Sequence, residues 1–134
     1  MSKVFKIGIA KNNNQKIEEV LSIDVLANKG IVGDRHFSEY NDPFNQLSLI
    51  ESENIDHYNK KYNLKISYID FRRNIITKGI KLNDLIDRKI LIGDTLFTFL
   101  LQLAKHNTLY VNEEKEETKR LRDIENQLYI KTFY

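Results

Sequence analysis

Short stretches in which apolar and polar residues alternate, each closed by turn-forming residues, dominate this chain up to residue 101. Such alternation is typical of half-buried strands, and glycine and asparagine mark the turns between them. A helical spacing is clear at residues 51–62, where Ile55, Tyr58 and Tyr62 fall on one face. The pattern therefore predicts a mainly β fold, a β-barrel with one or two added helices. We expect strands at residues 3–10, 20–26, 46–50, 71–77, 89–92 and 95–101.

The segments between these strands are polar. Residues 11–16 (KNNNQK) and 37–45 are predicted loops, and residues 82–86 are predicted to form a loop or a single helical turn. The spacing of Ser48 and Glu51 fits a capping box at the start of the predicted helix.

The chain changes character after residue 104. Residues 113–127 are dense in charge, and no glycine follows Gly93, although the turns of a β-barrel normally need glycine. We therefore predict a barrel domain at residues 1–104, which is incomplete, and a charged tail at 105–134 that is helical or disordered. An incomplete barrel exposes a strand edge, and that edge could pair two copies into a homodimer.

The composition argues against several classes of protein: nucleic-acid-binding, membrane-spanning and metal-binding. The chain has 134 residues, of which 41% are hydrophobic, which suits one domain with one core. Its 21 basic and 19 acidic residues argue against general nucleic-acid binding. No apolar run approaches the roughly 20 residues of a membrane span, and we see no signal peptide, so we expect a cytoplasmic protein with no membrane partner. There is no cysteine, and His36, His57 and His106 lack a metal-ligand spacing, so we expect no metal site.

Two segments place arginine beside turn-forming or strand-ending residues. In GIVGDRH (residues 30–36), Gly30 and Gly33 allow positive φ, Asp34 could orient its neighbour, and Arg35 offers paired donors for phosphate or carboxylate. The segment therefore predicts an anion site. The alternative is an ordinary Gly-Asp turn with a solvated arginine.

The second segment is FRRN, at residues 71–74. On a strand, Arg72 and Arg73 would point to opposite faces, so one could face the barrel interior. A buried arginine needs a partner, either Asp34 or a ligand anion, and Asn74 can read a polar ligand edge. The alternative is one structural salt bridge and one surface arginine.

Two further residues lie near this predicted site. Ser48 could contact a ligand phosphate near the start of the helix, although a helix cap is the simpler role. No neighbouring histidine or aspartate supports Ser48 as a nucleophile. Of the histidines, His36 alone lies near the candidate site in sequence.

Four segments belong together when they are taken in order: residues 30–36, 46–55 (QLSLIESENI), 71–80 (FRRNIITKGI) and 82–94. With the N-terminal strand they cover residues 4 to about 97, and together they resemble the MOSC domain, which is found at the C-terminus of molybdenum cofactor sulfurases. The resemblance implies a β-barrel that binds the molybdenum cofactor (molybdopterin), an anionic pterin dithiolene with a phosphate. By similarity, the pocket residues are Arg35, Arg72, Arg73 and Asn74, followed by Ser48, Thr77, Asp34 and His36.

The resemblance also implies a chemistry. Members of this family, which is associated with pyridoxal phosphate enzymes, carry sulfur on a cysteine persulfide, or ligate molybdenum through a cysteine and reduce N-hydroxylated compounds. A cofactor-biosynthesis protein or a molybdoenzyme is the implied partner. This chain departs from the pattern, because residues 100–106 (LLQLAKH) stand where the family has its cysteine, and Asp87 replaces a glycine common in that turn. We therefore expect cofactor binding without catalytic sulfur chemistry, and no catalytic residue.

Two hypotheses address the atypical tail. The first is a truncation or frameshift near residue 99, because residues 103–109 can be encoded by codons that read as a cysteine segment in a shifted frame. The second gives the chain another function, as a non-catalytic interaction module that binds a partner through a charged C-terminal helix.

Overall fold

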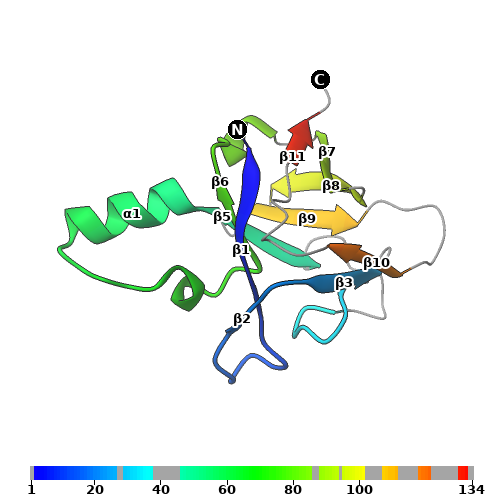
Figure 1. Cartoon of the computed structure of the whole chain (residues 1–134), viewed down its shortest axis with the longest axis horizontal. Coiled ribbons are helices and arrows are strands. Elements are labelled where there is room, and N and C mark those ends of the chain that lie inside the picture. The colour runs from blue at the N-terminus through cyan, green and yellow to red at the C-terminus, as the bar shows by residue number, and fades with distance from the viewer. Residues whose placement is uncertain are drawn as a thin grey trace.

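The computed structural model describes residues 2–26, 29–37, 46–85, 88–93, 95–101, 107–111, 118–121 and 130–132, with side chains described as far as residue 95. These residues form two sheets, one α-helix and two short 3-10 helices, η1 and η2 (Figure 1). The helices are α1 (Ser52–Lys61), η1 (Tyr68–Phe71) and η2 (Leu82–Leu85). The strands are β1 (Lys3–Ile9), β2 (Glu18–Val20), β3 (Ile23–Leu26), β4 (Gly30–Ile31), β5 (Leu47–Glu51), β6 (Ile75–Lys78), β7 (Lys89–Ile92), β8 (Thr95–Leu101), β9 (Asn107–Val111), β10 (Thr118–Leu121) and β11 (Ile130–Thr132).

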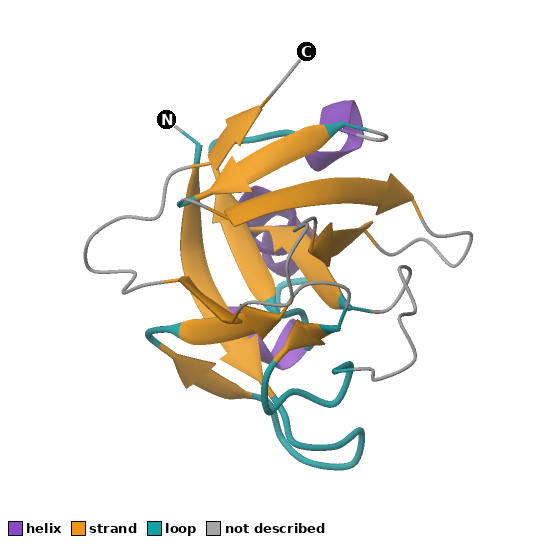
Figure 2. Cartoon of the chain, turned by 90° about the vertical axis from the view of Figure 1, so that its right-hand side faces the viewer, coloured by secondary structure: helices purple, strands orange, loops and turns teal. Residues whose placement is uncertain are grey.

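The larger sheet has eight strands in the order β11-β7-β8-β9-β5-β6-β1-β2, and the smaller has the order β10-β3-β4. Strands make up much of the described chain (Figure 2). Only the β5–β6 pair is parallel among the described pairings. Parallel neighbours require a crossover, and the connection that contains α1 and η1 provides it.

Strand β6 is buried on both faces because consecutive side chains of a strand point in opposite directions. Ile75 belongs to the main core, which also contains Ile7, Val25 and Leu47. Ile76 belongs to a second core that includes residues of α1 and η1, namely Ile55 and Ile69, together with Ala10 and Ile17. The start of β6 therefore lies at a well-packed point between two cores.

Much of the predicted architecture is confirmed. The fold is mainly β, with strands at or near residues 3–10, 46–50, 89–92 and 95–101 and a helix within 51–62. The predicted strand at 20–26 is instead two strands, because β2 ends at Val20 and β3 begins at Ile23. The described sheet is open rather than a closed barrel, since β2 and β11 are its two ends and no described pairing joins them.

The prediction of a strand at 71–77 is wrong in its first half. Phe71 ends η1, and Arg72 has a left-handed backbone with φ 60° and ψ 38°. Strand β6 begins only at Ile75. The alternation of a strand therefore does not decide where Arg72 and Arg73 point.

The prediction of a helical or disordered tail is also wrong for the described residues beyond 105. Strand β9 pairs with both β5 and β8, β10 pairs with β3, and β11 pairs with β7. These pairings join residues far apart in sequence, so the local pattern of charge does not reveal them. Residues 112–117 and 122–129 lie outside the described ranges.

Two details of the predicted helix are wrong. No side-chain hydrogen bond caps its N-terminus at Glu51, so the capping box does not form. Ile55 is buried, but Tyr58 and Tyr62 are exposed by 41% and 54%, so the predicted apolar face is covered only in part. None of the described helices is long and apolar enough to cross a membrane.

Candidate functional site

The carboxylate of Asp34 lies at the centre of a buried hydrogen-bond network. Its Oδ1 accepts hydrogen bonds from the backbone N–H of Ala10, from Nη1 of Arg35 and from Nδ2 of Asn74, each at 3.1 Å. Its Oδ2 accepts one from the backbone N–H of His36 at 3.0 Å. A buried carboxylate is costly unless it is paired and hydrogen-bonded, and this network meets both conditions. Asp34 therefore anchors the turn to β1 and to the start of β6.

Two glycines bring Asp34 to this position. Gly30 has φ 108°, and a Cβ there would lie 2.7 Å from the carbonyl oxygen of Gln46. Gly33 has φ 86°, which suits the turn that leads into Asp34. The predicted positive φ of both glycines is confirmed.

Arg35 is held rigidly. Besides its bond to Asp34, its Nη2 donates to the carbonyl oxygen of Arg72 at 2.9 Å, and its backbone N–H donates to that of Ala10 at 2.7 Å. Its side chain is only 6% exposed. The alternative of a solvated arginine is therefore wrong, and Arg35 is a fixed, partly neutralised cation.

Asn74 and Ser48 join β5 to the start of β6. Oδ1 of Asn74 accepts from the backbone N–H of Ser48 at 3.1 Å and from its Oγ at 3.3 Å, and the backbone N–H of Asn74 donates to that Oγ at 3.2 Å. Nδ2 of Asn74 also donates to the carbonyl oxygen of Gly8 at 3.0 Å. Thr77, fully buried, donates to the carbonyl oxygen of Ile50 at 3.5 Å. In this structure these three polar side chains bond within the protein.

Arg72 contacts the loop after β1. Its Nη1 donates to the carbonyl oxygen of Gln15 at 2.8 Å, and its Nη2 donates to that of Asn13 at 3.2 Å. The left-handed backbone of Arg72, at the end of η1, accompanies this arrangement. Its guanidinium thus holds the loop at residues 11–16.

Arg73 and His36 are half-buried and lie near Arg35. Burial lowers the pKa of Arg73, and the charge of Arg35 lowers it further. Burial also lowers the pKa of His36; Arg35 and Arg73 lower it too, while Asp34 and a hydrogen bond with Asn74 raise it. We call Arg35, Arg73 and His36 the basic cluster, because the charge of Arg35, after burial, contributes to the lowered pKa of both Arg73 and His36.

The structure brings seven of the eight predicted site residues into one connected neighbourhood, in which Asp34, Ser48, Arg72 and Asn74 support the basic cluster. Thr77 lies further along β6. Asn74, Ser48 and Thr77 are buried, whereas Arg72, Arg73 and His36 are half-buried. Whether the eight bind a ligand stays a prediction.

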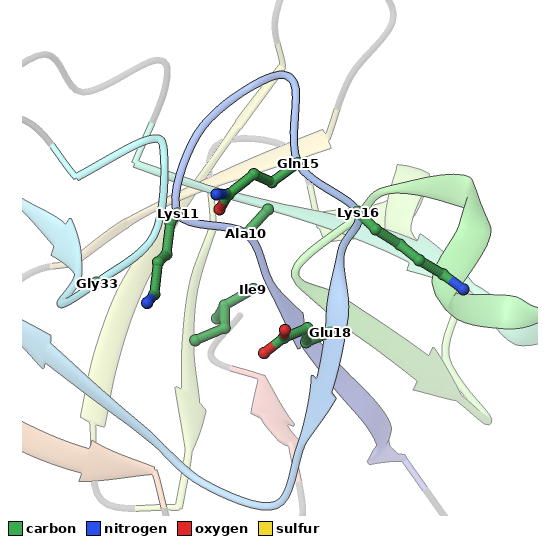
Figure 3. A pocket seen from close by; sticks show the side chains of 7 residues that line it. All are labelled: Ile9, Ala10, Lys11, Gln15, Lys16, Glu18 and Gly33. Carbon is green, nitrogen blue, oxygen red and sulfur yellow. The ribbon is translucent and has the colours of Figure 1, made fainter.

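A cavity of about 440 Å³ beside this neighbourhood was not predicted from the sequence. Residues of β1, the following loop and β2 supply most of its lining, and none of the eight predicted residues is among them (Figure 3). The lining residues are Ile9, Ala10, Lys11, Gln15, Lys16, Glu18 and Gly33. The run KNNNQK at 11–16 resembles an ordinary solvated loop, so its residues carry no signal of a cavity.

Metal ligands are not grouped in the described part of the chain, where no three histidine, aspartate or glutamate side chains are placed to hold an ion. The full sequence contains no cysteine. The titratable and charged groups that the described site brings together are guanidinium, imidazole and carboxylate groups.

Solved structures share the fold. YuaD from Bacillus subtilis matches with a TM-score of 0.71 at 16% identity, over 97% of this chain and 94% of YuaD. YiiM from Geobacillus stearothermophilus matches with a TM-score of 0.65 at 10% identity, over 100% of this chain and 76% of YiiM. A structure described as a hypothetical protein matches with a TM-score of 0.68 at 11% identity, over 98% of this chain and 68% of that one. No family model and no curated protein matches the sequence.

The likeness to YuaD bears on the predicted truncation. Because it covers 97% of the chain, it extends well past residue 99 into the tail. A truncation or frameshift near that position therefore gains no support from the fold.

Proposed function

We propose that this chain is a MOSC-type domain that binds the molybdenum cofactor through its phosphate at the basic cluster, and that it does so without sulfur chemistry. Two lines of evidence support the family. The four sequence segments resemble the MOSC domain, and the fold shared with YuaD and YiiM is consistent with a mainly β, MOSC-like structure. The cofactor itself is proposed from the resemblance and from the charge of the cluster.

The basic cluster carries the proposal. Both arginines contribute a guanidinium group: that of Arg35 is buried and bonded to Asp34, and that of Arg73 is half-buried, with a pKa lowered first by burial and then by the charge of Arg35. A phosphate would add negative charge beside these two cations and would accept hydrogen bonds from the arginines. Because Asp34 and the carbonyl of Arg72 already fix Arg35, little conformational entropy would be lost when an anion binds.

The residues of the site fit the phosphate of the cofactor, but the chain offers no cysteine for the chemistry at its molybdenum dithiolene. Arg73 and His36 would hold the phosphate, with Arg35 behind them. The bound group would supply redox or sulfur chemistry at its molybdenum dithiolene. A persulfide or a thiolate ligand requires a cysteine, and the chain has none. The protein is therefore proposed to hold or hand over the cofactor, with a cofactor-biosynthesis protein or a molybdoenzyme as its partner.

Titration with molybdopterin tests this proposal. An Arg73→Gln variant should bind it at least tenfold more weakly than the parent, because a hydrogen bond to a charged group contributes about 1.5–3 kcal/mol. Lys89→Gln is the matched control, since it removes one positive charge from an exposed position on β7. Equal affinities for the parent and Arg73→Gln would overturn the proposal.

The alternative function, an interaction module with a charged C-terminal helix, is not favoured. Residues 118–121 of that segment form β10, which pairs with β3.

A further inference from the structure

The cavity beside β1 and β2 has a polar rim and an apolar floor. Lys11 and Glu18 lie on the two sides of Ile9, and Lys16 points away from both of them (Figure 3). Ile9 is half-buried and offers apolar surface to the cavity, beside the buried Ala10. Gly33 leaves open space, because a Cβ there would meet nothing within 4 Å.

The loop that forms this wall is held in place. Arg72 donates to the carbonyl oxygens of Gln15 and Asn13, as described above. Within the loop, Asn12 accepts from the backbone N–H of Gln15 at 3.3 Å and, through its Oδ1, from that of Asn14 at 3.0 Å. The cavity is thus preformed, as is usual for small-molecule sites.

The charges that line the cavity have no counterion among the described side chains. Lys11, Lys16 and Glu18 make no ion pair there, whereas the neighbouring Glu19 pairs with Lys6 at 3.1 Å. An ammonium and a carboxylate therefore lie on opposite sides of an apolar floor without bonding to each other. This arrangement is complementary to a molecule with the opposite charges at its two ends.

We propose that this cavity binds a small zwitterion, in which a protonated amine and an acid group are joined by a short apolar chain. The amine would bond to Glu18, the acid group to Lys11, and the chain would cover Ile9. Charge-assisted hydrogen bonds at both ends favour such a ligand over a molecule with one charged end. This site uses none of the basic cluster, so it is independent of the proposed cofactor site.

Matched probes test the proposal. The affinities of 4-aminobutyrate, 5-aminopentanoate and 6-aminohexanoate are measured by NMR titration of the backbone amides of residues 9–18, beside those of butylamine and butyrate. We expect at least one amino acid to bind about tenfold more tightly than either singly charged probe, since one charge-assisted bond is worth about that factor. If butyrate or butylamine binds as tightly, or if no probe shifts these amides, the proposal is wrong.

Two variants test which residue binds the amine of the ligand and which binds its acid group. Glu18→Gln should reduce the affinity of the best amino acid to that of butyrate, and Lys11→Gln should reduce it to that of butylamine. Lys60→Gln is the control and should leave the affinity unchanged, because it removes one positive charge from an exposed position on α1 that is not part of the cavity lining. An unchanged affinity in Glu18→Gln would overturn the assignment. Arg73→Gln should also bind the amino acid normally, which separates this site from the cofactor site.

Discussion

Asn74 connects three segments through one side chain that is fully buried: Gly8 in β1, Ser48 in β5 and Asp34 in the glycine turn. The sequence predicts that Asn74 lies in the pocket and reads a polar ligand edge. In the structure its amide oxygen and nitrogen bond to these protein groups. Asn74 therefore stabilises the fold and holds the side chain of Asp34 in position.

Replacing Asn74 with alanine should lower the free energy of unfolding by about 2–3 kcal/mol, because buried polar groups of Ser48 and Asp34 would lose a partner. Denaturant unfolding measures the change. Ser48→Ala removes a single hydroxyl and should cost less, about 1 kcal/mol. A smaller loss in Asn74→Ala than in Ser48→Ala would contradict this view of the network.

His36 makes stability depend on pH. Burial and the nearby arginines lower its pKa in the folded state, so the unfolded state takes up a proton first as the pH falls. The folded protein should therefore lose stability on acidification below the ordinary histidine pKa of about 6.5. A His36→Asn variant should show a flatter profile of unfolding free energy between about pH 7 and pH 5. The same slope in both proteins would show that His36 is not responsible.

At the scale of elements, the turn between η1 and β6 differs most from what the sequence predicts. The sequence predicts that FRRN is part of a strand, yet Arg72 adopts a left-handed backbone at the end of η1. The local sequence does not predict a positive φ at Arg72, because arginine rarely adopts one. The hydrogen bonds of its guanidinium to the loop after β1 depend on contacts across more than fifty positions in sequence.

The backbone of Arg72 makes two substitutions distinguishable. Arg72→Ala loses the hydrogen bonds to the loop and keeps an unfavourable positive φ. Arg72→Gly loses the same hydrogen bonds, but glycine adopts a positive φ without penalty. The glycine variant should therefore be more stable than the alanine variant by about 1 kcal/mol. Thermal unfolding compares them, and amide exchange at residues 11–16 should be faster than in the parent in both. A more stable alanine variant would contradict the observed backbone.

The elements with strong local patterns were predictable, and those defined by distant pairing were not. Alternation located β1, β5, β7 and β8, and the helical spacing located α1. Strand β9 has no glycine turn beside it and precedes a highly charged segment, so only its pairing with β5 and β8 identifies it. The candidate site follows the same rule: the residues were predictable, and their roles as partners of one another were not.

Strand β9 should be essential, because it lies between β5 and β8 inside the larger sheet. Thr108 is paired with Ser48 on one side and Leu100 on the other. A Thr108→Pro variant removes a backbone donor from this interior strand and should lower the free energy of unfolding by about 1–3 kcal/mol, because a buried carbonyl group loses its partner. Thr108→Ala is the control for the side chain. A proline variant as stable as this control would restore the view that the tail is separate from the fold.

At the scale of the whole molecule, the fold is shared with YuaD at 16% identity. Its main core includes buried apolar residues of β1, β6 and β7, and a core of the right size and pattern tolerates many different sequences. The shared fold does not identify a ligand, so the function rests on the basic cluster and on the four sequence segments. A homodimer through a sheet edge stays a prediction, which sedimentation of the purified protein can check.

The location of the bound cofactor tests the central claim most directly. NMR spectra of the arginine Nε–H groups and the His36 ring are recorded while molybdopterin is added. We predict that the signals of Arg73, Arg35 and His36 shift together and that the pKa of His36 rises, because a bound phosphate favours its protonated form. Binding that leaves these three side chains and the pKa of His36 unchanged would contradict the claim that the basic cluster is the cofactor site.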